Sequence, residues 1–301
     1  MIFTWNPPNS GTPVIFSRDA TDYQLLLNYS GFAGIPGEHV YADKAPMRHG
    51  KKRKYTTLTE REVSFDVLIL SDDLTEQQTL VQALAAAFYP LDGAGILQYT
   101  KEDGTVYYLN CIGTTGNPVL SPTDKSTTHQ KATIRVVADE DPFWHAGSPS
   151  IEYFDPNPAN YMPFPNGTGT WPWSLSSLNK IKNCQNTGSV DAPIIVTFTG
   201  PMTNPVLTCT KTVDGESVTE TLSLTITMIA DDVLIVNTDP DIMTARYYPA
   251  AGGDNNAHKY VDTDATFWQL GRGSNTVELD PDTSSTGAEA SVQWSDRYVG
   301  I

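Results

Sequence analysis

Apolar and polar residues alternate most regularly in the stretch EVSFDVLIL, residues 62–70. A period of two residues is that of a half-buried strand. The residues on its apolar face are Val63, Phe65, Val67 and Ile69. We therefore predict a strand here, with this face turned toward a core.

The period changes to that of a helix in SDDLTEQQTLVQALAAAFYP, residues 71–90. Asp73 is placed to cap the first turn, with Glu76 three residues on, and Pro90 ends the helix. The predicted apolar stripe comprises Leu74, Val81, Leu84 and Phe88. This is the one helix that the sequence predicts, and its alanines would let it lie close against a sheet.

Antiparallel strands are expected after the helix, at residues 96–100 and 106–112, joined by a hairpin turn. A polar stretch, 113–130, separates them from another strand at ATIRVVA, and Pro142 ends the strand pattern. The first domain is expected to span residues 1–146.

Residues 147–190 differ in kind, because they hold six prolines and several aromatic residues but no sustained period. We predict a long extended connection. A disordered segment seldom carries so many aromatics, so we expect them to pack onto a domain or a neighbouring subunit.

Short apolar stretches recur from residue 191 to 301, separated by turn residues. They are PIIVTFTG, PVLTCTK, ETLSLTITM, DVLIVNT, TFWQL, NTVELD and EASVQWS. About seven strands without a helix predict a sandwich or jelly roll. Trp268 and Trp294 fall in these strands, where we expect them to be core residues.

Composition agrees with two β-rich domains, since 301 residues with 22 Gly, 21 Pro and only 18% charged residues favour short strands and many turns. The net charge of -16 opposes sequence-specific DNA binding and docking on anionic membranes. The N-terminus lacks a signal-peptide pattern and the chain has no apolar run of membrane-spanning length. We expect folding in a cytoplasm and no stable membrane insertion.

This acidic chain contains one strongly basic segment, with six Lys or Arg from Lys44 to Lys54. Only Tyr41 and Tyr55 flank it, so the interleaved aromatics of a single-strand nucleic-acid binder are missing. The cluster is either a solvated hairpin tip or a docking site for an acidic neighbour, and the rest of this chain is such a neighbour.

Candidate chemistry is sparse. The common nucleophile, phosphate-loop, dinucleotide and metalloprotease motifs are absent, and the five histidines are scattered in loop-like contexts. Cys111, Cys184 and Cys209 are read as reduced thiols. Three D-x-D pairs, at 239/241, 262/264 and 280/282, are read as solvated turns, with a calcium site or paired glycosidase acids as the alternatives. No cofactor and no metal are expected.

Several segments resemble those of one protein family in their sequence pattern and in their order along the chain. In the first domain these are the loop 44–55, EVSFDVLIL, EQQTLVQALAAAF, PLDGAGILQY and RVVADEDPFW. In the second they are KNCQNTGSVDAPIIVTFTGPMTNPVLT, DDVLIVNT, and GRGSNTVELD to AEASVQWSDRYVGI. In these segments the chain resembles the distal tail proteins of long-tailed bacteriophages, the siphovirus tail components of the baseplate hub.

The resemblance implies a mostly β fold with one helix: a tail-tube-like β-sandwich or barrel, then a galectin-like β-sandwich. It implies a non-enzymatic virion protein at the distal end of the tail. Six copies would form a homohexameric ring around a channel for DNA, joining the tail tube protein to the tail-tip hub protein and anchoring receptor-binding or tail-fibre proteins. The galectin sugar-binding pattern H-x-N-P-R is absent, so sugar binding is not implied.

Two site hypotheses follow. Lys51, Lys52, Arg53 and Lys54 are expected on a hairpin that contacts an adjacent subunit or ring. Trp171 and Trp173 are expected to dock a receptor-binding protein or a neighbouring sandwich domain. The rival functions are a carbohydrate-binding module of a virion or cell-surface adhesin, and a polysaccharide hydrolase.

Overall fold

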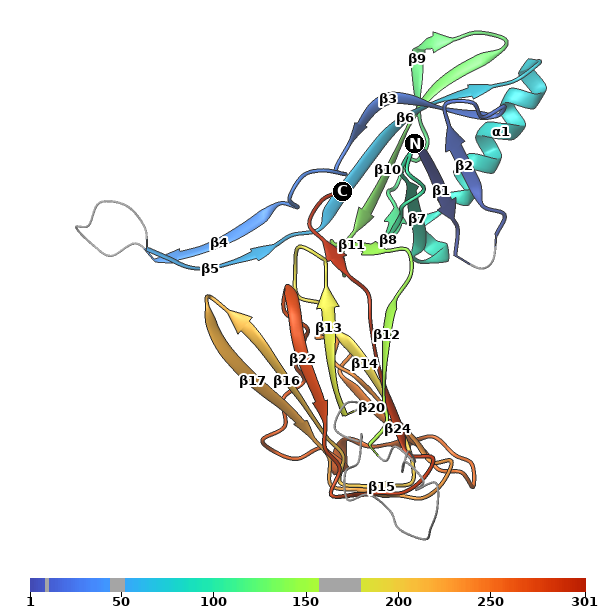
Figure 1. Cartoon of the computed structure of the whole chain (residues 1–301). Helices are drawn as coiled ribbons and strands as arrows, with labels where there is room; N and C mark the ends of the chain where they lie inside the picture. The colour runs from blue at the N-terminus through green and yellow to red at the C-terminus, as the bar shows by residue number, and fades with distance from the viewer. Residues whose placement is uncertain (9–10, 44–51, 157–179) are drawn as a thin grey trace. The chain divides into compact units, whose positions relative to one another are not determined.

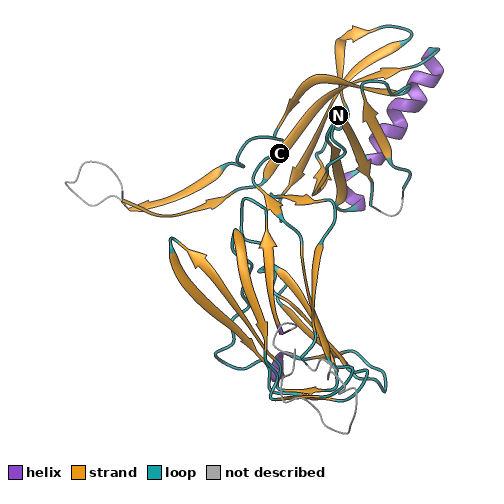
Figure 2. Cartoon of the chain, in the orientation of Figure 1, coloured by secondary structure: helices purple, strands orange, loops and turns teal. Residues whose placement is uncertain are grey.

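The strand predicted from alternation is β6, Arg61–Leu70, and its four apolar residues are buried as expected. A computed structural model of the chain describes residues 1–8, 11–43, 52–156 and 180–301. These residues form two compact units, residues 1–147 with 298–301, and residues 148–297 (Figure 1). The described residues are mostly β, with a single α-helix (Figure 2).

The first unit is built around a closed barrel. Its strands follow one another around the barrel in the order β8-β7-β1-β2-β3-β6-β10, and pairing of β8 with β10 closes it. The new bounds are β1 Ile2–Asn6, β2 Val14–Ser17, β3 Tyr23–Ser30, β7 Gly95–Thr100, β8 Val106–Gly113 and β10 His129–Ala138. Apolar residues of these strands fill the interior, with Phe3, Trp5, Phe16 and Phe65 among the largest.

Three shorter strands extend this sheet at its ends, and a 3₁₀ turn follows helix α1 (Leu74–Ala87). They are β9 Val119–Lys125, β11 Trp144–Ala146, the 3₁₀ turn η1 Pro90–Asp92 and the C-terminal β25 Arg297–Tyr298. The polar stretch 113–130 thus contains a strand, β9, which pairs with β10 at the rim. A separate two-stranded ribbon is formed by β4 Glu38–Asp43 and β5 Lys52–Leu58.

Helix α1, Leu74–Ala87, begins as predicted, since Asp73 accepts hydrogen bonds from the backbone N–H groups of Thr75 and Glu76. Its apolar stripe is only partly as predicted. Leu84 is buried, whereas Leu74 is 48% exposed and Gln77 is buried. Gln77 donates a hydrogen bond to the carbonyl of Ser126, which compensates for the burial of its amide group.

The second unit is a sandwich of two antiparallel sheets. One has the order β12-β24-β14-β19-β20-β21 and the other β13-β22-β16-β17. Their bounds are β12 Ser150–Phe154, β13 Ile181–Asn186, β14 Ile194–Thr199, β16 Val206–Val213, β17 Glu216–Ser223, β19 Val233–Asn237, β20 Thr244–Tyr248, β21 Asn255–Asn256, β22 Gly273–Leu279 and β24 Glu289–Trp294. Apolar residues of both sheets form one shared core.

The remaining elements of this unit are short. They are β15 Met202–Thr203, β18 Thr227–Met228, β23 Thr283–Ser284 and the 3₁₀ turn η2 His258–Tyr260. The stretch TFWQL was predicted as a strand, but it forms only an isolated bridge between Leu270 and Ala192. Trp268 is nevertheless a core residue, as is Trp294 in β24. Burial was therefore easier to predict than backbone pairing, which depends on a distant partner.

The units differ from the expected domain bounds in two places. Strands β12 and β13 fall inside the segment 147–190 that was predicted to be a connection, and both pair with strands of the second unit. The chain's last residues, 298–301, belong to the first unit. Both differences arise from pairing with strands far away in the sequence, which local periodicity does not report.

Candidate assembly surfaces

The β4–β5 ribbon is an exposed element of the first unit. The two strands pair in antiparallel register, and among the described residues neither pairs with any other strand. Tyr41 and Tyr55 lie opposite each other and stack, with ring centroids 4.3 Å apart, although about half of each side chain is exposed. An isolated two-stranded ribbon is marginally stable in water. This ribbon therefore presents an exposed aromatic pair on two strands that no other described strand supports.

The structure describes the predicted basic residues only in part. Lys51 lies outside the described residues, Lys52 and Arg53 lie in β5 without described side chains, and Lys54 is exposed in β5. The described backbone places these last three at the outer end of the ribbon, beyond the tyrosine pair. Trp171 and Trp173 also lie outside the described residues.

Tyr41 and Tyr55 were noted in the sequence only as flanking residues. The sequence feature that could have indicated their contact is that one lies before the basic cluster and the other after it. In a hairpin, two residues on either side of the turn can lie opposite each other. The bulge between Tyr41 and Ala42 sets the register. Without knowledge of that bulge, the pairing could not be predicted.

An open groove of about 850 Å³ runs between the start of the chain and helix α1. Its apolar lining comes from Pro7, Pro8, Pro13, Ile15, Ala83 and Ala86. Two hydrogen bonds hold the helix in place beside it: Trp5 Nε1 donates to the carbonyl of Ala87 at 2.6 Å, and the Tyr23 hydroxyl donates to that of Leu80 at 3.0 Å. Burial, with the nearby charge of Asp22, raises the pKa of Tyr23 to about 12.

A second groove of about 590 Å³ shares Thr21 and Asp22 with the first. Among the described residues that line it, the acids are Asp22, Asp72, Glu76 and Asp124 and the cation is Lys131. Lys131 is already paired with Asp66 at 3.0 Å. The first groove is also lined by acids, Asp19, Asp22 and Asp92, so both grooves carry acidic side chains.

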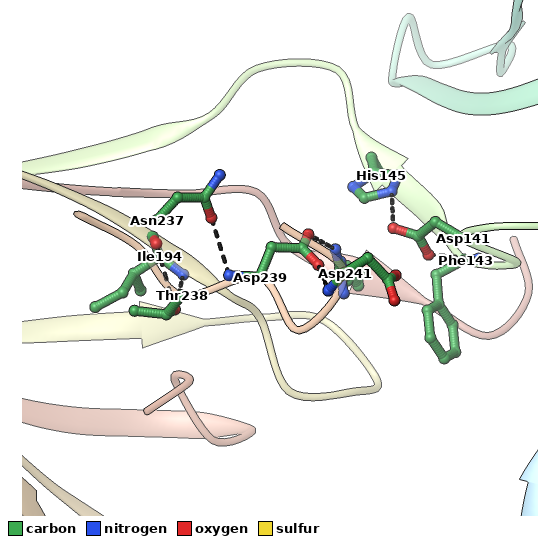
Figure 3. Close-up of polar contacts among 9 residues, drawn as sticks. Asp141, Phe143, His145, Ile194, Asn237, Thr238, Asp239 and Asp241 are labelled. Atoms are coloured by element: carbon green, nitrogen blue, oxygen red, sulfur yellow. Dashed lines mark hydrogen bonds and ion pairs between the residues drawn. The ribbon is translucent and has the colours of Figure 1, made fainter. Parts of the chain in front are cut away.

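The D-x-D pairs lie in turns of the second unit, as predicted. Asp239 accepts from the backbone N–H of Asp241 and pairs with Arg297 Nη2 at 2.8 Å (Figure 3). Asp262 accepts from the Thr225 hydroxyl, and Asp280 pairs with Lys180 at 3.3 Å. Within the described ranges, no group of three or more His, Cys, Asp or Glu side chains is placed to hold a metal ion.

The histidines were expected in loops, which is wrong for His39 in β4 and for His129 in β10. It is also wrong for His145. This histidine lies in β11, is buried against the Tyr108 ring, and places Nε2 3.0 Å from Asp141 Oδ2 (Figure 3). Asp141 also accepts from the backbone N–H of Phe143, so the pair fixes the turn that enters β11.

Asp66 lies between the buried Phe65 and Val67 of β6 and is itself buried. Burial alone would raise its pKa; hydrogen bonds from Thr133, Asn28 and Lys131, with the charge of Lys131, lower it below its usual range. The three cysteines are free and buried, and burial raises the pKa values of Cys184 and Cys209 to about 12. Asp66 and the three thiols therefore have structural roles, and the buried thiols are not activated for reaction. No helix among the described residues is long and apolar enough to span a membrane.

Comparison with known proteins finds one matching family model and several solved structures with a similar fold. Residues 187–298 match the family model of the siphovirus-type tail component, C-terminal domain. The Dit protein (gp 19.1) of phage SPP1, described as a paradigm of the hub adsorption apparatus in phages infecting Gram-positive hosts, has the same fold, with a TM-score of 0.66 at 11% identity over 99% of both chains. No curated protein sequence matches the chain.

A chain of the phage p2 baseplate is also similar. In the activated conformation with Sr its TM-score is 0.52 at 10% identity, over 100% of this chain and 99% of that one. In the conformation with Ca the TM-score is 0.51. The resemblance found in the sequence is thus confirmed: residues 187–298 match the model of the siphovirus-type tail component, C-terminal domain, and the whole chain has the fold of SPP1 Dit and of a chain of the phage p2 baseplate.

Proposed function

We propose that the protein is a distal tail component that forms a homohexameric ring, joins the tail tube protein to the tail-tip hub protein, and anchors receptor-binding or tail-fibre proteins. The observation that carries this proposal is the likeness to SPP1 Dit over 99% of both chains, because it includes both units and their order. The protein would lie at the distal end of the tail in the virion and act through its interfaces, without catalysis.

The ribbon supports ring formation. A heterologous contact, in which one surface of a subunit meets a different surface of the next, generates a ring when the rotation closes. The β4–β5 ribbon offers the first surface, and its basic end would meet an acidic neighbour. We propose that Lys51, Lys52, Arg53 and Lys54 contribute to this contact.

A ring of such acidic subunits would also suit a channel for DNA. With a net charge of -16 per chain, six copies repel the phosphate backbone at long range, so DNA could pass without adhering. The galectin-like character of the outer sandwich stays a prediction. Docking of partners through Trp171 and Trp173 also stays a proposal, and full attachment of the receptor-binding protein to the W171A/W173A variant would count against it.

The test is the mass of the purified full chain by light scattering at low and moderate salt, with electron microscopy of the same sample. We expect a hexameric ring, or a trimer-hexamer equilibrium that shifts with salt. Charge reversal at all four basic residues should weaken assembly at moderate salt. A chain that stays monomeric at every concentration would refute the ring and favour the carbohydrate-binding module.

A further inference from the structure

The β16–β17 hairpin of the second unit extends beyond the sheet that supports it. The two strands pair over all eight residues of each, but β16 pairs with β22 only from Leu207 to Thr210. Residues 212–219 are all exposed. Figure 1 shows the hairpin at one edge of the second unit, where β17 is the last strand of its sheet. The far end of the hairpin is thus a two-stranded element, which has little stability of its own in water.

The outer edge of β17 is bonded at one end and open at the other. The backbone N–H of Thr266 donates to the Thr221 carbonyl at 2.7 Å, so this carbonyl points away from β16. Alternate residues of a strand direct their backbone groups to the same side. Ser217 and Thr219 therefore also direct their N–H and C=O groups away from β16. Among the described residues, no other strand or loop bonds to these four groups.

An open edge of this kind can accept a further strand, because an extended chain has matching N–H and C=O groups at the same spacing. A proline or a bulge would prevent such pairing. The open half of β17, residues 216–220, has the sequence ESVTE, which contains no proline, and it pairs with β16 without a bulge. The backbone of this half is therefore free to pair with an extended segment.

The charge around this edge favours a basic segment. Residues 151–301 carry 18 Asp or Glu against 7 Lys or Arg. At the hairpin, Lys211 is already paired with Glu220. No ion pair joins Asp214 or Glu216 to a cation of the described chain. A Lys or Arg side chain opposite Glu216 would therefore stabilise an added strand.

A second copy of β17 matches this edge less well. The register that uses all four open backbone groups places Ser217 of one copy opposite Thr219 of the other. The same register places Glu216 of one copy opposite Glu220 of the other. Like charges directly opposite each other in a sheet are destabilising, and charged residues at an edge keep identical edges apart. The charge thus discriminates against self-pairing and in favour of a different, basic chain.

We infer that residues 216–220 accept an extended segment of a partner protein as an additional β-strand, with a Lys or Arg side chain opposite Glu216 and an apolar side chain opposite Val218. Val218 is 37% exposed and lies on the same face of the strand as Glu216. This surface belongs to the second unit alone, so it goes beyond the proposed ring and does not depend on whether six copies associate.

Hydrogen exchange of the full chain, with and without a basic peptide, tests this inference. The probe is the synthetic peptide TKTVTKT, in large excess, because it alternates β-branched residues with two lysines on either side of a valine. We expect the amides of Ser217 and Thr219 to gain protection when the probe is present. Strand β13, at the other edge of the same sheet, should not change.

Variants of the full chain separate backbone pairing from charge. T219P removes one outward N–H, and its ring lies at the open edge, where it costs no hydrogen bond to β16. T219V is the matched control, because it keeps this N–H. We expect T219P to lose the probe and T219V to bind it like the wild type. E216K should weaken binding of TKTVTKT roughly 10-fold and bind the acidic peptide TETVTET instead.

Retained protection of the core amides in β16 and β22 would show that each variant is folded. No protection of Ser217 and Thr219 by the probe, or equal binding of the probe to T219P and T219V, would overturn the added strand. Equal binding of the basic and acidic peptides to the wild type would overturn the basic partner. Protection that rises with protein concentration without any peptide would make a second copy the occupant, and would also overturn the inference. A monomeric wild type that binds the probe would refute the ring alone.

Discussion

Arg61 is the residue whose replacement we expect to disturb the first unit most. Its side chain is 2% exposed, and its guanidinium donates to the backbone carbonyls of Pro142 and Gly31 at 2.6 Å, Gly34 at 3.0 Å, and Val299. These carbonyls belong to three segments that are distant in sequence. Arg61 thus fastens the chain's last residues to the barrel, and R61M removes every donor while roughly keeping the volume.

The size of the effect follows from two opposing terms. Four charge-assisted hydrogen bonds at about 1.5–3 kcal/mol each give about 6–12 kcal/mol. Burial of the guanidinium costs several kcal/mol, and burial is also the cause of the lowered pKa of Arg61. Breaking such a network leaves four carbonyls without their donors, so we expect R61M to lose about 3–5 kcal/mol. That is a large part of the stability of one domain.

Hydrogen exchange followed by mass spectrometry suits this test, because it reads the two units separately. Peptides covering 28–35 and the C-terminal residues should lose protection in R61M, and peptides of the second unit should not. R135M is the matched control, since Arg135 is exposed in the neighbouring strand β10. A loss below about 1 kcal/mol, or equal losses in R61M and R135M, would refute the reasoning.

Three other results are expected. Because the pKa of Asp66 is lowered on folding, its stabilisation of the first unit is present above about pH 4 and is lost as the pH falls toward the folded pKa; D66N should show a smaller fall in urea midpoint between pH 7 and pH 3 than the wild type. The three buried thiols should not react with a thiol reagent at pH 8 until the chain is unfolded, and a fast-reacting thiol in the native protein would contradict their burial. Replacing the helix cap, D73A, should cost about 1 kcal/mol in thermal unfolding, whereas D92A should change little.

Elements with a strong local period were predictable. Strand β6 and helix α1, with its Asp73 cap, depend on residues that are close together in the sequence. Strand β20, with the sequence TARYY, was missed because its polar residues mask its alternation, and TFWQL was predicted as a strand although its apolar residues pack without a ladder.

The candidate surfaces show the same division. The basic cluster could be read directly from the chain, since charge is a property of single residues. The stacking of Tyr41 on Tyr55 could not, because it depends on the register of two strands separated by a loop. The groove of about 850 Å³ joins residues of the chain's start, β2 and α1, which no sequence spacing brings together.

The sequence by itself therefore determined the local elements, the balance of charge and the family resemblance, all of which depend on the order of nearby residues. Only the tertiary structure decided the closure of the barrel through β8 and β10, the return of residues 298–301 to the first unit, and the exposure of Leu74 in exchange for buried Gln77. The physical reason is that backbone groups and buried amides must find hydrogen-bond partners, and in this fold those partners lie far away along the chain.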